Sequence, residues 1–139
     1  MVQILTGGPG SGKTKALVQL VNAAVQRSKG NVICVEQKRK LVHEVTNRAR
    51  LIATDDYAVA GFDAFYGFLA GVCASDHDIT DIFVDATLRI GSRDGGELLV
   101  FLKKVAKLAQ ESETAFTFTV STPPADLPAE IFDVAKKVA

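Results

Sequence analysis

The chain has 139 residues, of which 47% are hydrophobic and 23% charged, and its sixteen basic residues balance sixteen acidic ones. This length predicts a single domain, residues 1–139, that is large enough to bury a core. The charged fraction argues against disorder. Because the charges balance, no global attraction to nucleic acid or to an anionic membrane is expected, so a nucleic-acid partner is left open but unsupported by charge.

No targeting or membrane segment is expected from the sequence. The chain does not open with a basic stretch followed by a long apolar run, and no segment approaches eighteen uninterrupted apolar residues. Cys34 and Cys73 are far apart in sequence, each among apolar neighbours. They are interpreted as buried, reduced thiols of a cytoplasmic protein, and neither a disulfide nor a zinc site is predicted.

The first half of the chain alternates between short apolar runs and longer amphipathic ones. Strands are predicted over Val2–Leu5 and Val32–Val35, and a helix over Lys13–Ser28, whose apolar residues recur at helical spacing. A basic, mostly exposed helix is predicted over Lys38–Arg50. Its inward face is expected to hold Leu41, Val42 and Val45.

The second half continues the alternation. Strands are predicted over Tyr57–Ala60, Ile82–Val84 and Phe116–Val120, and helices over Phe62–Ala74, from Asp94 to about Gln110, and over Asp126–Val138. Asp94 and Glu97 form a capping box, and Pro128 falls in the first turn of the last helix. This order predicts an α/β fold, a three-layer αβα sandwich around a mostly parallel sheet of about five strands.

Two expectations concern strand positions in that sheet. The strand that ends at Asp85 and the Phe116–Val120 strand are expected beside Val2–Leu5. In the latter, Phe116, Phe118 and Val120 alternate with threonines, a pattern that favours a half-covered or edge strand.

The sequence GGPGSGKT, Gly7 to Thr14, follows the first strand and precedes the first helix. It matches the phosphate-binding loop pattern GxxxxGK[ST] in its required context. Glycines let successive N–H groups point into one cavity, and the helix adds the positive end of its dipole. The predicted nucleotide-binding residues are Gly7, Gly8, Pro9, Gly10, Ser11, Gly12, Lys13, Thr14 and Lys15.

Within this loop, Lys13 is expected to reach the β- and γ-phosphates and to serve catalysis, and Thr14 to offer its hydroxyl to Mg²⁺. The triphosphate is predicted to be ATP, because no NKxD-type guanine-reading sequence follows a later strand. The alternative interpretation is an ordinary glycine-rich turn before a helix.

Asp85 ends the apolar run Ile82-Phe83-Val84 and resembles the Walker B aspartate that holds Mg²⁺. Asp81 competes for this role but would lie at the start of the strand, at the wrong sheet edge. Many related ATPases carry a catalytic glutamate directly after this aspartate. Here that position is Ala86, whose methyl group cannot orient or deprotonate a water.

The chain resembles the RecA-like P-loop ATPases in GGPGSGKT, in NVICVEQKRK, in DIFVDATLRI and in FTFTVSTPP. The resemblance implies the P-loop NTPase fold. It also implies that Glu36, at the end of the second strand, activates the attacking water. Ser121 or Thr122 would sense the γ-phosphate. The alternatives are that Glu36 is a solvated turn residue and that the hydroxyls cap a turn.

Several basic residues lie near the predicted site. Lys38, Arg39 and Lys40 are interpreted as a solvated surface rather than as a nucleic-acid contact, and Arg89 and Arg93 as loop charges rather than arginine fingers. The predicted function is a slow Mg²⁺-dependent ATPase. A nucleotide-dependent switch without rapid turnover and a small-molecule or nucleotide kinase are the alternatives, and a protein partner or homo-oligomer is left open.

Overall fold

The computed structural model describes all of residues 1–139. Its sheet is entirely parallel, with the strand order β3-β2-β4-β5-β1-β6. The strands are β1 (Val2–Thr6), β2 (Asn31–Glu36), β3 (Arg50–Ala53), β4 (Ile79–Val84), β5 (Ala115–Val120) and β6 (Lys136–Lys137). The predicted α/β class is confirmed, with six strands where about five were predicted.

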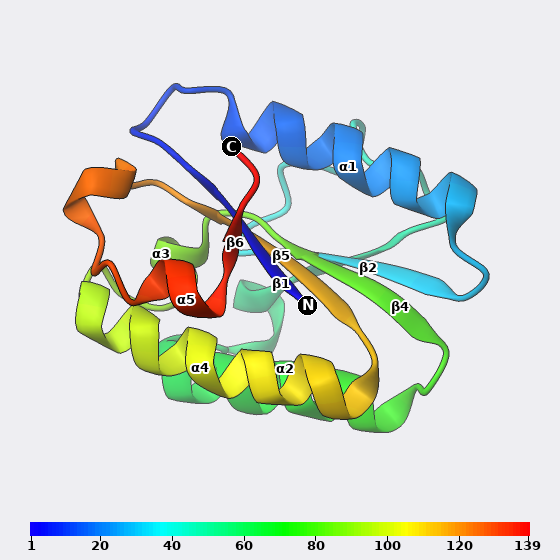
Figure 1. Cartoon of the computed structure of the whole chain (residues 1–139). Helices are drawn as coiled ribbons and strands as arrows, with labels where there is room; N and C mark the ends of the chain where they lie inside the picture. The colour runs from blue at the N-terminus through cyan, green and yellow to red at the C-terminus, as the bar shows by residue number, and fades with distance from the viewer.

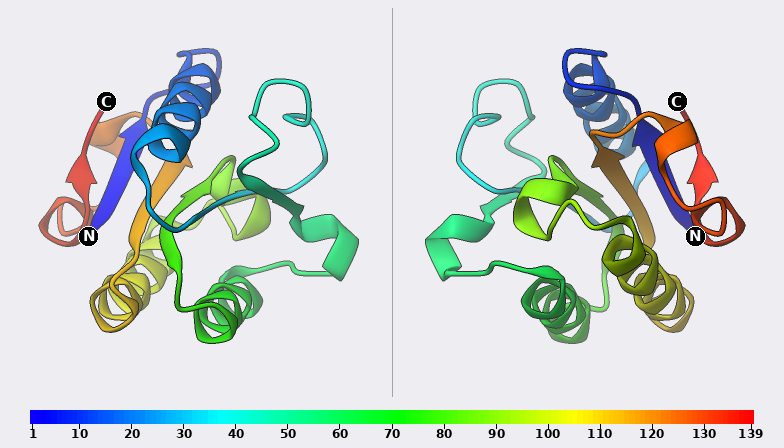
Figure 2. Two further views of the ribbon diagram at one scale, coloured as in Figure 1. Left: turned by 90° about the vertical axis from the view of Figure 1, so that its right-hand side faces the viewer. Right: turned by 90° about the vertical axis from the view of Figure 1, so that its left-hand side faces the viewer.

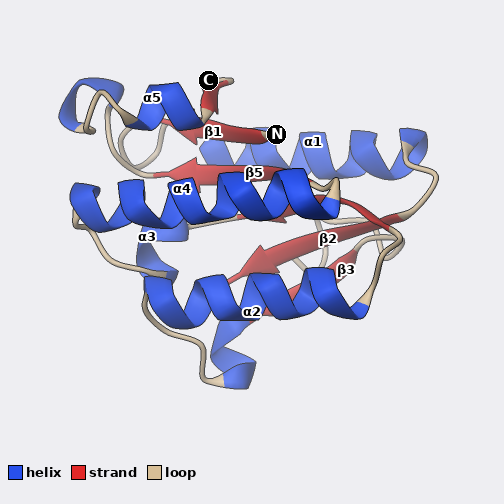
Figure 3. Ribbon diagram, turned by 60° about the horizontal axis from the view of Figure 1, so that its bottom comes forward, coloured by secondary structure: helices blue, strands red, loops and turns tan.

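Helices cover both faces of the sheet (Figure 1). They are α1 (Lys13–Arg27), α2 (Phe62–Ser75), α3 (Thr87–Ile90), α4 (Gly95–Ser112) and α5 (Ile131–Val134). Helix α1 lies on one face, and α2 and α4 run side by side across the other (Figure 3). The arrangement has the three layers of an αβα sandwich. None of these helices combines the length and the apolar character needed to cross a bilayer.

Two hydrophobic clusters, one on each side of the sheet, form the core. The larger joins the sheet to α2 and α4, with Phe65, Phe101 and Phe118 among its fully or almost fully buried residues. The smaller joins it to α1 through Leu17, Val21 and other residues. Every central strand is therefore buried on both faces, as expected of a parallel sheet.

The expectation that Phe116–Val120 forms a half-covered or edge strand is wrong. β5 lies between β4 and β1, so it neighbours β1 as predicted, while the strand of Asp85 lies one position further away. The phenylalanines of β5 belong to the larger cluster, and Thr117 and Thr119 are buried on the opposite side. Their hydroxyls donate to Gln3 and Asp85, which makes threonine tolerable inside the sheet.

The helix predicted over Lys38–Arg50 is absent, because residues 37–49 form a loop and Arg50 begins β3. Leu41 and Val45 are buried as predicted, but Val42 is 56% exposed. Backbone groups that would pair with one another in a helix are instead hydrogen-bonded to the side chains of Glu36 and Asn22. The Glu36 carboxylate accepts the N–H groups of Lys40 and Leu41, and Asn22 binds Glu44 O and the Thr46 N–H.

The strand predicted over Tyr57–Ala60 is also absent. The third strand is Arg50–Ala53, and the chain then turns through a 3₁₀ helix, Thr54–Tyr57. Ala58, which follows, has a left-handed φ of 56°, a conformation that is incompatible with a continuing strand.

The helix predicted over Asp126–Val138 is replaced by three short elements. A 3₁₀ turn, Pro124–Asp126, precedes the single-turn helix α5 and strand β6. The C-terminal residues form a strand instead of a helix because the backbone groups on the side of β1 away from β5 need partners. There the Val138 N–H donates to Ile4 O, and the Thr6 N–H donates to Ala139 O. By contrast, one half of the predicted capping box of α4 is confirmed, with the Asp94 carboxylate accepting the Glu97 N–H. The other half is absent, because the Glu97 carboxylate accepts from Ser92 and the Asp94 N–H donates to Ser92 Oγ.

Candidate functional site

The carboxyl ends of the parallel strands meet at one edge of the sheet, and the glycine-rich loop leaves β1 at this edge. Gly7, Gly10 and Gly12 have φ angles of 139°, 78° and 85°, which favour glycine. At Gly7 the space is also closed, since a Cβ atom there would lie 2.6 Å from Ser11 Oγ. The Gly7 N–H donates to Thr122 O, which ties the loop to the segment after β5.

The loop presents unpaired backbone N–H groups at the start of α1. Gly12 caps this helix in a left-handed conformation, and no side chain caps it. The N–H groups of Gly10 and Gly12, and those of residues 13–15 in the first helical turn, donate to no protein atom. Together with the positive end of the helix dipole, such groups form a site suited to an anion.

Lys13 lies over this loop. Its Nζ atom donates to Gly8 O at 2.9 Å and to Ser11 Oγ at 3.2 Å. The ammonium group is therefore bound within the glycine-rich loop rather than in the core. Lys15 and Ser11 are exposed on the same segment.

Asp85 lies opposite the loop, immediately after β4. The hydroxyl of Thr14 donates to both of its carboxylate oxygens, at 3.1 and 3.2 Å. The hydroxyl of Thr119, in β5, donates to Asp85 Oδ1 at 2.8 Å and accepts the Ala86 N–H at 2.8 Å. Asp85 is thus fixed from two sides. Asp81, the competing residue, lies in β4 and is paired with Arg27 at 3.2 Å, away from this site.

Thr119 is a residue of this site that the sequence does not predict, although its alternation with the phenylalanines of β5 is visible there. It is only 2% exposed, and its hydroxyl links the Asp85 carboxylate to the Ala86 backbone. Ala86 itself has a left-handed φ of 54°, which is uncommon for a residue with a side chain. Nothing in the sequence around Ala86 predicts that conformation.

Glu36 ends β2 at the same edge but is engaged differently. It is 3% exposed, and its two carboxylate oxygens accept the backbone N–H groups of Lys40 and Leu41, at 2.9 and 3.3 Å. Burial raises the pKa of its carboxyl, although these two hydrogen bonds favour the charged form. Glu36 is therefore neither solvated nor a simple turn residue.

A hollow of about 430 Å³ extends from the loop to the ends of β4 and β5. Besides the loop, it is lined by Asp85, Arg89, Arg93, Thr119 and Ser121. Of the two hydroxyls predicted to sense the γ-phosphate, Ser121 lines the hollow and Thr122 does not. A much smaller hollow adjoins it, sharing Asp85 and Arg89 and reaching Glu36, Lys38 and Lys40. The predicted residues thus gather in two adjoining spaces, with Glu36 in the lesser one.

This site contains few protein ligands for a metal. Nowhere in the chain do three His, Cys, Asp or Glu side chains cluster to hold an ion by themselves. Thr14 and Asp85 offer only oxygen atoms, which is the preference of Mg²⁺, an ion that keeps several waters and commonly binds through one or two carboxylates plus substrate phosphates.

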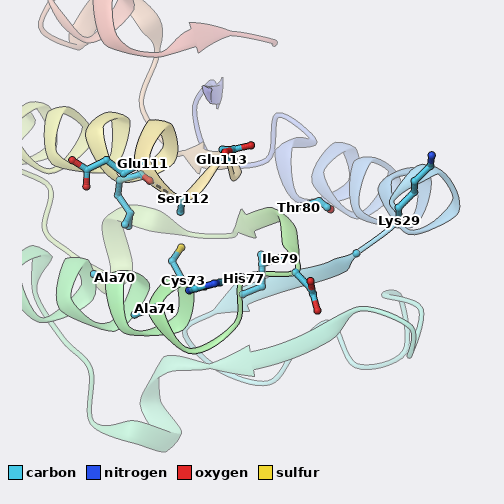
Figure 4. A pocket seen from close by; sticks show the side chains of 13 residues that line it. Lys29, Ala70, Cys73, Ala74, His77, Ile79, Thr80, Glu111, Ser112 and Glu113 are labelled. Carbon is cyan, nitrogen blue, oxygen red and sulfur yellow. Dashed lines mark hydrogen bonds between the residues drawn. The ribbon is translucent and has the colours of Figure 1, made fainter.

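The largest hollow, about 680 Å³, lies at the opposite edge of the sheet, between the C-terminal ends of α2 and α4 (Figure 4). Cys73, His77 and Ser112 line it, and it contains none of the predicted site residues. Cys73 and Cys34 are both buried and free, as expected. Burial raises the pKa of both thiols, that of Cys34 to about 12, so neither is a reactive thiolate at neutral pH.

Neither models of known protein families nor curated protein sequences give a match to this chain.

Proposed function

We propose that this protein binds Mg²⁺-ATP at the glycine-rich loop, as a P-loop nucleotide-binding protein, and that it hydrolyses ATP slowly. The observation that carries the proposal is the hydrogen bond between Thr14 and Asp85, because it brings the glycine-rich loop and the acidic residue after β4 together, as a nucleotide-metal site would require. The free N–H groups of residues 12–15 and the ammonium of Lys13 add a binding surface for the phosphates.

The residues that would hold the metal are Thr14 and Asp85. Mg²⁺ would neutralise the charge that develops on the phosphate oxygens during transfer. Thr119 would keep the Asp85 carboxylate in one orientation, since it donates to one of its oxygens from inside the sheet. ATP is proposed over GTP on the absence of a guanine-reading sequence after a later strand.

The RecA-like assignment is part of this proposal. It is supported by a glutamate at the end of β2 and by a small residue, Ala86, after Asp85. In this proposal Glu36 accepts the proton of the attacking water as the bond to the γ-phosphorus forms, and ADP leaves. The raised pKa of Glu36 suits a base that works near neutral pH, because a more basic carboxylate accepts a proton more readily.

A second candidate function is a nucleotide-dependent switch that binds ATP without rapid turnover. Two observations favour it. Ala86 supplies no base, and both oxygens of Glu36 already accept backbone N–H groups. A conformational change of the loop after β2 would then be needed to free the Glu36 carboxylate.

The deciding experiment measures ATP and GTP binding to the pure protein by calorimetry, with and without Mg²⁺, followed by phosphate release with and without single- and double-stranded nucleic acid. Mg²⁺-dependent ATP binding with slow release is expected. Failure to bind any nucleoside triphosphate would overturn the proposal. Binding without release under every condition would replace the ATPase by the switch.

A further inference from the structure

The charges of this neutral chain are strongly segregated along its sequence. Residues 1–50 carry nine basic and two acidic side chains, whereas residues 51–97 carry nine acidic and two basic ones. The first segment contains α1 and the loop after β2, and the second contains α2 and the start of α4. A balanced total therefore hides a basic and an acidic segment of the sequence, which are joined in the fold by the ion pairs Arg27–Asp81 and Arg39–Asp56.

The basic loop, residues 37–49, stands out from the sheet on the side of α1 (Figure 2). Lys38, Arg39, Lys40 and Arg48 give it four positive charges against the single negative charge of Glu44. The Arg39 guanidinium is paired with Asp56 at 2.8 Å, so the lysines and Arg48 are the cations left to a partner. Val42 lies among them and is 56% exposed, one of the few large apolar side chains on the surface.

This loop has a defined shape. Leu41, Val45 and Ala49 are buried in the smaller core cluster, and the hydrogen bonds of Glu36 and Asn22 hold its backbone. A surface that is ordered before it binds loses little conformational entropy on association.

The α2–α4 groove, a hollow of about 460 Å³, lies on the opposite face of the sheet. Phe62, Tyr66, Val100 and Phe101 give it an apolar lining, and Val100 is 59% exposed. Its rim is acidic, formed by Asp63, Asp94 and Glu97. The one cation of the groove, Lys104, lies over the Tyr66 ring, with its Nζ atom 4.4 Å from the ring centroid.

We propose that the basic loop of one molecule docks into the α2–α4 groove of a second copy. A basic loop with an exposed valine matches an apolar groove lined also by acidic residues, both in hydrophobic character and in charge. Because the loop and the groove lie on opposite faces of the sheet, they cannot meet within one molecule. The contact is therefore head-to-tail, and such contacts build rings or open chains rather than closed two-fold dimers.

Single-stranded nucleic acid is the competing candidate for the partner that binds the basic loop. Sequence-independent binding of single strands commonly uses aromatic side chains on which bases stack. Residues 37–49 contain no Phe, Tyr or Trp. The exposed valine and the complementary groove favour a second copy. None of the groove residues belongs to the proposed nucleotide site, whereas Lys38 and Lys40 of the basic loop line the small hollow beside it.

The test is sedimentation velocity of the full chain over a range of concentrations up to about 100 µM, since small and polar interfaces are often weak. In about 50 mM salt we expect association that grows with concentration and that about 500 mM salt reverses by screening. A monomer at every concentration in low salt would overturn the proposal, as would association that is indifferent to salt.

Two double variants locate the contact. Asp63→Lys with Val100→Lys alters the groove but leaves the helix cap at Asp94 intact, and Lys38→Glu with Val42→Glu alters the loop. Each should weaken self-association at least about tenfold, the cost of placing like charges across an interface. Glu111→Lys, an equally exposed charge reversal at the far sheet edge, is the matched control and should associate like wild type.

Mixing the two double variants gives the decisive result, with circular dichroism first confirming that each is folded. The mixture contains one native loop and one native groove, so association should return. Failure to recover it would overturn the head-to-tail contact. The last measurement is the binding of a labelled single-stranded oligonucleotide. If monomeric wild type binds it and the loop variant does not, the basic loop is a nucleic-acid surface and the proposal is wrong.

Discussion

The hydroxyl of Thr14 donates to the carboxylate of Asp85, although 71 residues separate them in the sequence. Thr14 lies in the first turn of α1 and Asp85 lies just beyond β4, two positions away from β1 in the sheet. The strand between them, β5, supplies Thr119, whose hydroxyl binds the same carboxylate. Three segments that are distant in sequence therefore fix one acidic group beside the glycine-rich loop.

Lys13→Ala is expected to weaken nucleotide binding strongly while leaving the protein folded. Charge-assisted hydrogen bonds to an anion contribute about 1.5–3 kcal/mol, so affinity should fall by on the order of a hundredfold. Titration with a fluorescent ATP analogue measures the loss. Lys29→Ala, an exposed lysine at the opposite sheet edge, is the control and should bind like wild type. Unchanged affinity in folded Lys13→Ala would remove the phosphate-binding interpretation of the loop.

Asp85→Asn should weaken the Mg²⁺ dependence of ATP binding more than it weakens binding without metal. The substitution removes the negative charge that would face the ion, while the N–H groups of residues 12–15 remain available to the phosphates. ATP affinity measured over a Mg²⁺ titration tests this. An equal loss with and without Mg²⁺ would show that Asp85 acts on the loop itself, through Thr14.

Thr119→Val should shift the same Mg²⁺ titration, because the Asp85 carboxylate loses one of its two hydroxyl donors. The variant also leaves the Ala86 N–H without its partner, so the free energy of unfolding should fall by about 1–3 kcal/mol. Thr119→Ser keeps the hydroxyl and is the matched control. If Val and Ser variants give the same Mg²⁺ dependence, Thr119 has only a packing role.

The raised pKa of Glu36 predicts a specific pH dependence of stability. The folded state holds this proton to higher pH than the unfolded state does, so the contribution of Glu36 to stability is greatest below the unfolded pKa. It is lost as the pH rises through the folded pKa. Urea unfolding of wild type and Glu36→Gln between about pH 4 and pH 7 isolates the effect. The stability of wild type relative to the variant should decline with rising pH and then level off, and a relative stability that rises with pH would contradict the prediction.

The sequence predicts well the elements with a clear local pattern. The helices α1, α2 and α4 repeat apolar residues at helical spacing, and the Asp94 cap marks the start of α4. The strands β1, β2 and β4 are short apolar runs of the kind that a buried parallel sheet requires. The glycine-rich loop was equally readable, since its positive φ angles at Gly10 and Gly12 need glycine.

The errors arose where distant partners decide the local structure. Residues 38–50 have a helical spacing of apolar side chains, but Glu36 and Asn22 take their backbone groups. The C-terminal residues would suit a helix, but the open edge of β1 binds them as β6. For Thr119, the alternation in β5 is visible in the sequence, but only the strand order shows that the half-buried carboxylate of Asp85 receives its hydroxyl.

Glu36→Gln tests the remaining step of the proposed reaction. If Glu36 accepts the proton of the attacking water, the amide should keep ATP affinity and lower turnover by about a hundredfold or more, the usual effect of losing a general base. The alternative is that Glu36 only anchors the basic loop, because its carboxylate already accepts hydrogen bonds from Lys40 and Leu41.

Phosphate release under saturating ATP separates the two roles, with ATP affinity and the melting temperature measured alongside. Equal turnover in wild type and variant would assign Glu36 to the loop alone. The amide replaces one of the two accepting oxygens by an NH2 group, so the melting temperature should fall in either case. A loss of turnover at unchanged affinity would assign Glu36 to the reaction.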